Sequence, residues 1–346
     1  MCRKAAVVIG AVIALCIASG VGGYLYSQVG GNDTSTSTST AQAAVTAKGG
    51  TSTRAALKAA KWASVVKASY GSTSVKLSTN DIPNHKRDAY YAVPNAQVVV
   101  PSASTAHIVK DPTKAQSLSY TIPTKPEYSS TITDSPLGSI GLMISGAVLY
   151  NPYEGDGTTV AMSSNFSLTQ SDGTKVWFVD QCSGHPTPDV GQYHYHAGST
   201  CITSKVDTAS GPSHLIGVAL DGFPIYGPRD INGKTVPVKS LDRCNGIKSA
   251  TPEFPKGIYH YVLPNTTDAT SSIRCFHGVV DATQITAMPP MGGNMPDLAA
   301  AAAKLGITET QLTDAFGTTM PPDFAEAAKK LGITEAELKT ALGVPG

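Results

Sequence analysis

The run Tyr193-His194-Tyr195-His196 is the part of the sequence with the clearest capacity for chemistry. Side chains alternate along a β-strand, so His194 and His196 are expected to share one face, with Tyr193 and Tyr195 on the other. Two imidazoles at this spacing are about 6.5–7 Å apart at the backbone and can converge on one metal ion. The run therefore predicts a transition-metal site, with copper or zinc as the ion.

A shorter copy of this run stands at 259–261, as Tyr-His-Tyr. Each copy follows a D-x-C-x-G pattern and precedes another cysteine, so the order of elements is repeated. If the two copies pair as strands, His260 joins the face of His194 and His196 and supplies a third imidazole. Val262 stands where the second copy would need its last histidine, which excludes a symmetric four-histidine site.

Two further histidines are candidate metal ligands. His185 lies in 182–185, just before the first copy, and His85 ends the segment 80–85. Their spacing does not tie either residue to the expected strand pair.

Other interpretations of the same residues stay open. Alternating Tyr and His can form a purely structural ladder, in which hydroxyls and neutral imidazoles hydrogen-bond to one another. A face of this kind would suit a cell-surface module that binds a glycan or a protein. Catalysis would require a carboxylate in a cleft beside His194, so enzymatic activity is undecided. Asp180 and Asp242 hold equal places in the two copies and are better explained as caps of turns.

The cysteines outside the N-terminal segment predict disulfides. An even number of cysteines in an exported chain indicates an oxidising compartment and, here, two bridges. The four residues are Cys182, Cys201, Cys244 and Cys275. The repeated order of elements favours the local pairs Cys182–Cys201 and Cys244–Cys275, with pairing across the two copies as the alternative.

The first 28 residues predict export. A basic start is followed by an uncharged, largely apolar run from 5 to about 26. This run is longer than a secretory h-region of about 7–15 residues and reaches the length of about 20 that a membrane span needs. We expect residues 1–28 to be a membrane anchor or a cleaved signal peptide. Both alternatives place the body of the protein outside the cytoplasm, either anchored or secreted.

The rest of the chain predicts a mainly β fold. The full sequence has 33 Gly and 23 Pro, which suit a turn-rich protein, and short apolar runs such as 141–144 predict strands. We expect a disulfide-containing sandwich or barrel-like domain over 72–284. A Ser/Thr/Ala-rich stalk over 29–71, with one short helix from residue 54, precedes the domain. A Pro/Gly/Met linker over 285–295 follows it.

Residues 296–346 contain a two-copy repeat that predicts two helical hairpins. Thr308 and Thr334 are the expected N-caps, and Gln311 and Glu337 complete a capping box in each copy. The net charge of +1 and the lack of a basic stripe argue against nucleic acid as a partner. The expected partners are the membrane, through the N-terminal segment, and a surface ligand or protein.

The sequence resembles the YHYH-domain proteins over roughly 72–280. The similarity is carried by a combination of blocks, at 80–85, 180–186, 193–196, 215–227, 242–246, 259–261 and 275–278. The resemblance implies an exported protein and brings no assigned activity with it. The sequence departs at Val262, where the family often has a second YHYH histidine, and this departure weakens a metal site built from both copies.

Overall fold

The computed structural model describes residues 50–284, except 97 and 282, together with 298–316 and 324–342. The expected N-terminal anchor or signal peptide and the expected linker lie outside these residues. Within the described part of the chain, no helix is both long and apolar enough to cross a membrane.

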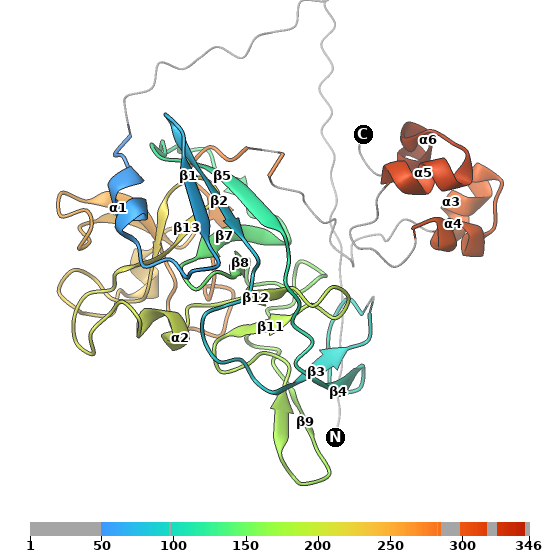
Figure 1. Ribbon diagram of the computed structural model, residues 1–346, viewed down its shortest axis with the longest axis horizontal. Coiled ribbons are helices and arrows are strands. Elements are labelled where there is room, and N and C mark those ends of the chain that lie inside the picture. Colours follow the sequence, from blue (N-terminus) through green and yellow to red (C-terminus); the bar gives the residue numbers. More distant parts are fainter. Residues whose placement is uncertain (1–49, 97, 282, 285–297, 317–323, 343–346) are drawn as a thin grey trace, which may run out of the picture. The chain divides into compact units, whose positions relative to one another are not determined.

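The predicted mainly β fold is confirmed, and its centre is a mixed sheet of eight strands (Figure 1). In spatial order the strands are β11 (Gly184–Pro186), β12 (Tyr193–Tyr195), β8 (Val148–Tyr150), β7 (Ser139–Met143), β13 (Leu215–Ala219), β14 (Pro224–Tyr226), β16 (Ile258–Val262) and β15 (Gly246–Ser249). All eight strands lie between residues 139 and 262, and four of them, β11, β12, β15 and β16, belong to the two motif copies.

The sheet consists of two equivalent halves. In the first half, β7 pairs antiparallel with β8, β8 parallel with β12, and β12 antiparallel with β11. In the second half, β13, β14, β16 and β15 follow in the same order with the same directions. The halves meet at the antiparallel pair of β7 and β13. The sheet therefore has an approximate two-fold axis at its centre.

The register at this centre agrees with the symmetry. Residues 140–152 and 216–228 align without a gap, and this alignment matches Leu142 with Val218. The same two residues are cross-strand partners in the sheet. A Cβ on Gly141 would lie 2.8 Å from the Val218 carbonyl oxygen, and one on Gly217 would lie 2.9 Å from that of Leu142. Both glycines are thus required by the close approach of the two central strands.

Smaller sheets surround the central one. They are β1 (Lys67–Tyr70), β2 (Ser74–Thr79) and β5 (Leu118–Pro123); β3 (Tyr90–Pro94) and β4 (Ala106–Lys110); β9 (Ser167–Thr169) and β10 (Lys175–Trp177); and β6 (Thr133–Asp134) and β17 (Cys275–Phe276). The helical elements of this region are α1 (Arg54–Ala59), α2 (Thr200–Thr203) and the 3-10 turn η1 (Val238–Ser240). The expected helix after residue 54 is therefore short, and the chain enters β1 before residue 72.

Each half of the sheet holds one disulfide. The bonds are Cys182–Cys201 and Cys244–Cys275, so the local pairing is present and pairing across the copies is not. The Asp180 carboxylate accepts from the amides of Cys182 and Gly184, which is the expected turn-capping role. Asp242 does the same in the second copy.

The described residues after 297 form four helices. They are α3 (Leu298–Leu305), α4 (Glu309–Phe316), α5 (Phe324–Leu331) and α6 (Glu335–Leu342). Both capping boxes are present: Thr308 Oγ1 accepts from the Gln311 amide, and Thr334 Oγ1 accepts from the Glu337 amide. The apolar faces of the four helices share one small core of their own.

Candidate metal centre

The hairpin of β11 and β12 brings three histidines to one face of the sheet. Antiparallel pairing places His185 directly opposite His194. His196 follows His194 by two residues, so its side chain lies on the same face. One ring nitrogen of each histidine lies within 4.8 Å of the others. The three side chains, called the histidine cluster below, are only 4%, 4% and 1% exposed in sequence order.

Main-chain carbonyls determine which nitrogen of two rings carries the proton. His194 Nδ1 lies 3.2 Å from the Gln192 carbonyl oxygen, and His196 Nδ1 lies 2.7 Å from that of Asn151. A carbonyl can only accept, so both Nδ1 atoms donate and both Nε2 atoms carry a lone pair. These two Nε2 atoms are 3.0 Å apart. Two lone pairs at this distance repel each other unless a cation or a proton lies between them.

His185 has no hydrogen-bond partner for either ring nitrogen among the described residues. An imidazole buried in this way loses its hydration without replacement, which costs roughly 1–3 kcal/mol per polar group. A bound cation would provide the missing partner. Spacing alone did not connect His185 to the motif, because the connection depends on the hairpin register.

Aromatic rings form the walls of the histidine cluster. Tyr150 stacks on His194 with ring centroids 4.0 Å apart, and the Phe178 ring meets His185 edge-on at 4.1 Å. The Tyr150 hydroxyl also donates to Gln192 Oε1, at 3.2 Å. Tyr150 and Gln192 thus hold His194 from two sides. Sequence reasoning missed both residues, since neither stands inside the motif.

The surroundings keep all three imidazoles neutral. Burial lowers the pKa of His185 and of His194 well below the ordinary value, and neighbouring histidines lower both further. Burial also lowers the pKa of His196 to about 4. Neutral imidazole is the form that binds metal, so no proton has to leave before an ion enters at neutral pH.

His260 does not join the histidine cluster, contrary to the expectation that the two copies pair. It lies on β16, and four strands separate β16 from β12. Its Nδ1 donates to the Ile258 carbonyl oxygen at 3.0 Å. Ile247 faces it across the hairpin, where the first copy has His185, and Val262 replaces His196. The second half therefore keeps the strand arrangement of the first, but only one of the three equivalent positions is a histidine.

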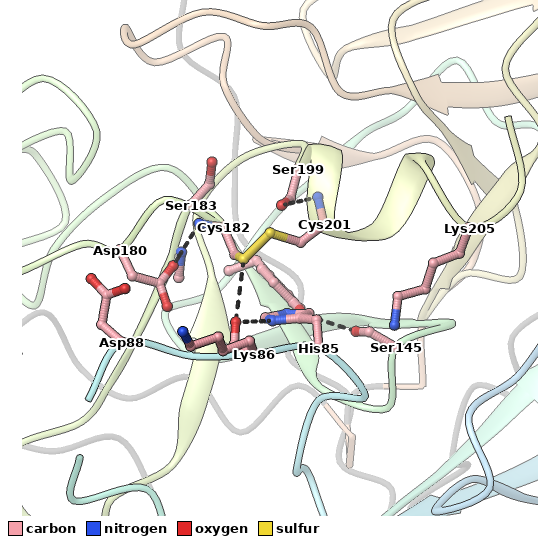
Figure 2. Close-up of a disulfide and its surroundings, with 12 residues drawn as sticks. His85, Lys86, Asp88, Ser145, Asp180, Cys182, Ser183, Ser199, Cys201 and Lys205 are labelled. Carbon is pink, nitrogen blue, oxygen red and sulfur yellow. Dashed lines mark hydrogen bonds between the residues drawn. A yellow bond between two sulfur atoms is a disulfide. The ribbon is translucent and has the colours of Figure 1, made fainter. Parts of the chain in front are cut away.

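His85 lies on the opposite, tyrosine-bearing face of β12. Its Nδ1 donates to the Lys86 carbonyl oxygen, so its Nε2 accepts from the Tyr195 hydroxyl at 2.5 Å. Ser145 Oγ is 2.9 Å from the same hydroxyl. Figure 2 shows His85 between the disulfide and Ser145. Alternation along β12 therefore separates His85 from the histidine cluster.

The tyrosines of both copies lie on the other face, where carboxylates are the hydrogen-bond partners of three of them. The hydroxyl of Tyr193 donates to Asp180, and that of Tyr259 donates to Asp242. The Tyr261 hydroxyl donates to Asp221 at 2.6 Å. Asp221 is fully buried, and burial raises its pKa to about 6. The tyrosine face therefore holds Tyr–Asp hydrogen bonds in place of the expected Tyr–His ladder, whereas on the histidine face both ring nitrogens of His185 have no partner among the described residues.

Comparison with known protein families finds a match over the part of the chain that contains both Tyr-His-Tyr runs. The model of the family described as YHYH protein matches residues 119–239 and 233–278, which include the histidine cluster and His260. The region 119–278 of the chain therefore belongs to the YHYH protein family. The match starts after His85, so the block at 80–85 is not part of it. The chain has no significant match among curated proteins or among solved structures.

Proposed function

We propose that this YHYH protein binds one transition-metal ion, copper or zinc, through His185, His194 and His196. The observation that carries the proposal is the set of buried ring nitrogens that face one another and have no other partner in the described part of the chain. Ligands at about 2.0–2.1 Å from one ion, at angles between square and tetrahedral, lie about 2.8–3.4 Å apart. The 3.0 Å between the Nε2 atoms of His194 and His196 falls within this range.

The outer contacts of the ligands support the same proposal. Metal-binding histidines usually donate their second ring N–H to a carbonyl or a carboxylate, which fixes the ring orientation. His194 and His196 both do so, to the carbonyls of Gln192 and Asn151. This contact turns Nε2 toward the centre of the histidine cluster before any ion arrives.

The burial of the tyrosines weighs against the alternative of a glycan- or protein-binding face at this motif. Tyr193 and Tyr195 are 0% exposed, so neither ring can reach an external ligand without opening the sheet. We also propose that the domain works outside the cytoplasm. Two disulfides, each with at least one fully buried cysteine, suit an oxidising compartment.

Metal analysis of matched variants tests the proposed function. His194 and His260 hold the same position in the two halves and are both buried, so His194→Leu and His260→Leu should disturb folding similarly. We expect about one ion per chain in the parent and in His260→Leu after incubation with copper or zinc and dialysis. His194→Leu should retain none. A parent that retains no metal, or two variants that behave alike, would refute the proposal.

A further inference from the structure

We infer that the ion taken by the histidine cluster is monovalent copper, held by imidazole nitrogens alone. The inference rests on the proposed function and specifies its ligand. It follows from the charge of the site, from its coordination number and from its closure to water.

The histidine cluster brings no negative charge to the ion. Among the described residues, the group contains three histidines and neither a carboxylate nor a cysteine. Cys182, the nearest cysteine in sequence, is bonded to Cys201 and cannot act as a thiolate. The second nitrogens of His194 and His196 donate to neutral carbonyls, where many metal sites place a carboxylate. A bound ion therefore keeps its whole charge inside the protein.

The electrostatic cost of burying an ion rises with the square of its charge. A divalent ion in this site would consequently cost about four times as much as a monovalent one, before ligand bonds are counted. Tyr150 and Phe178 present rings rather than charged groups to the cluster. The lower electrostatic cost of burying a monovalent ion favours Cu⁺ over Zn²⁺ and Cu²⁺.

The number of ligands that the cluster offers also favours Cu⁺. Structural zinc sites have four protein ligands, and catalytic ones complete three with water; Cu²⁺ prefers a tetragonal set. The cluster supplies three nitrogens, and its side chains are at most 4% exposed, which leaves little access for a coordinating water. Cuprous ion has a filled d shell and is stable with few ligands, and imidazole is a good ligand for copper.

The test compares three ions on the full-length chain with its disulfides intact. Samples are loaded with Cu⁺ under anaerobic ascorbate, with Cu²⁺ in air, or with Zn²⁺, and are then exposed to a moderate chelator of each ion. Bound metal is measured after gel filtration, and Cu²⁺ is followed by electron paramagnetic resonance. We expect one Cu⁺ per chain to survive, whereas Zn²⁺ and Cu²⁺ are removed. His194→Leu should lose Cu⁺, and His260→Leu should keep it.

Failure of this inference can be distinguished from failure of the proposed function. The parent and His260→Leu could instead retain one Zn²⁺ or Cu²⁺ per chain, with none retained by His194→Leu. This result would overturn the preference for Cu⁺ and leave metal binding intact. Retention of none of the three ions would overturn both. Cu⁺ bound equally by the parent and His194→Leu would also overturn both, because the histidine cluster would not be its site.

Discussion

At His194 and His196, the hydrogen bond made by one ring nitrogen determines the chemistry of the other. The Gln192 and Asn151 carbonyls take the Nδ1 protons, which leaves two lone pairs 3.0 Å apart. In His260 the equivalent bond, to Ile258, is present as well. The bond alone therefore does not create the proposed metal site, which also requires His185 and His196 beside the same ring.

A second buried group at the residue scale is Glu154, which is 7% exposed. Its Oε1 has no hydrogen-bond partner among the described residues. Burial, followed by the nearby charge of Asp156, raises its pKa from 4.5 to about 8. The folded state thus favours the protonated carboxyl. The associated stability is complete below the unfolded pKa and is lost as the pH rises through about 8.

Glu154→Gln should remove this dependence, because glutamine is neutral at every pH. The free energy of unfolding of the variant, relative to the parent, should rise between pH 5 and pH 9 by up to about 5 kcal/mol, as an order of magnitude. Urea unfolding at a series of pH values measures it. Glu127→Gln, at an exposed position, is the control. A difference that stays constant with pH would show that Glu154 is not protonated in the folded protein.

At the element scale, the hairpin of β11 and β12 lies inside a disulfide-closed loop. Cys182–Cys201 joins residues 19 apart in sequence, and all three histidines of the cluster lie between them. Cys244–Cys275 closes the equivalent loop of the second half, 31 residues apart. In the chain-entropy estimate, loops of these sizes stabilise the fold by about 3–4 kcal/mol each.

We expect the Cys182–Cys201 disulfide to increase the affinity for metal, and the Cys244–Cys275 disulfide to have no such effect. Replacing Cys182 and Cys201 by serine should lower stability about as much as replacing Cys244 and Cys275 by serine. Only the first pair should also weaken metal binding, by at least about tenfold, because the hairpin that aligns the ligands loosens. Metal titration at a temperature where both variants are folded measures this. Equal affinities in the two variants would contradict the expected role.

The sequence predicted the individual strands and disulfides better than it predicted which strands pair in the sheet. Alternation placed His194 and His196 on one face, and the repeated order of residues predicted both disulfides. The choice of strand partners could not be read in this way, because β12 pairs with β8, whose sequence lacks the motif. This long-range pairing separates His260 from the cluster, while the hairpin register adds His185.

At the scale of the whole molecule, the halves of the central sheet are joined by the contacts of β7 with β13 and by the chain between them. Each disulfide joins two cysteines of the same motif copy, so neither of them links the halves. Outside the central sheet, β6 pairs with β17. The hydroxyls of Ser271 and Ser272 donate to the carbonyls of His196 and Tyr150 in the first half. The halves are therefore held together by strand pairing and core packing.

A chain divided after Ala209, a surface residue between the halves, should therefore reassemble. We expect the two co-expressed fragments to purify together without reducing agent and to separate on denaturing gels. Leu142→Pro should prevent co-purification, because proline removes a hydrogen bond at the central strand pair. Co-purification that is unchanged by this substitution would show that β7 and β13 do not hold the halves together.

The two halves of the sheet are related to each other as the two subunits of a symmetric dimer are, but here they are joined in one chain. In a homodimer both subunits come from one gene, so every substitution occurs twice, and the assembly has two sites or none. Fusion in tandem removes this constraint. Ile247 and Val262 can then stand in one half at the positions that the proposed ligands His185 and His196 hold in the other. The fused chain can thus hold a single site in a symmetric frame, with its second half free to serve stability alone.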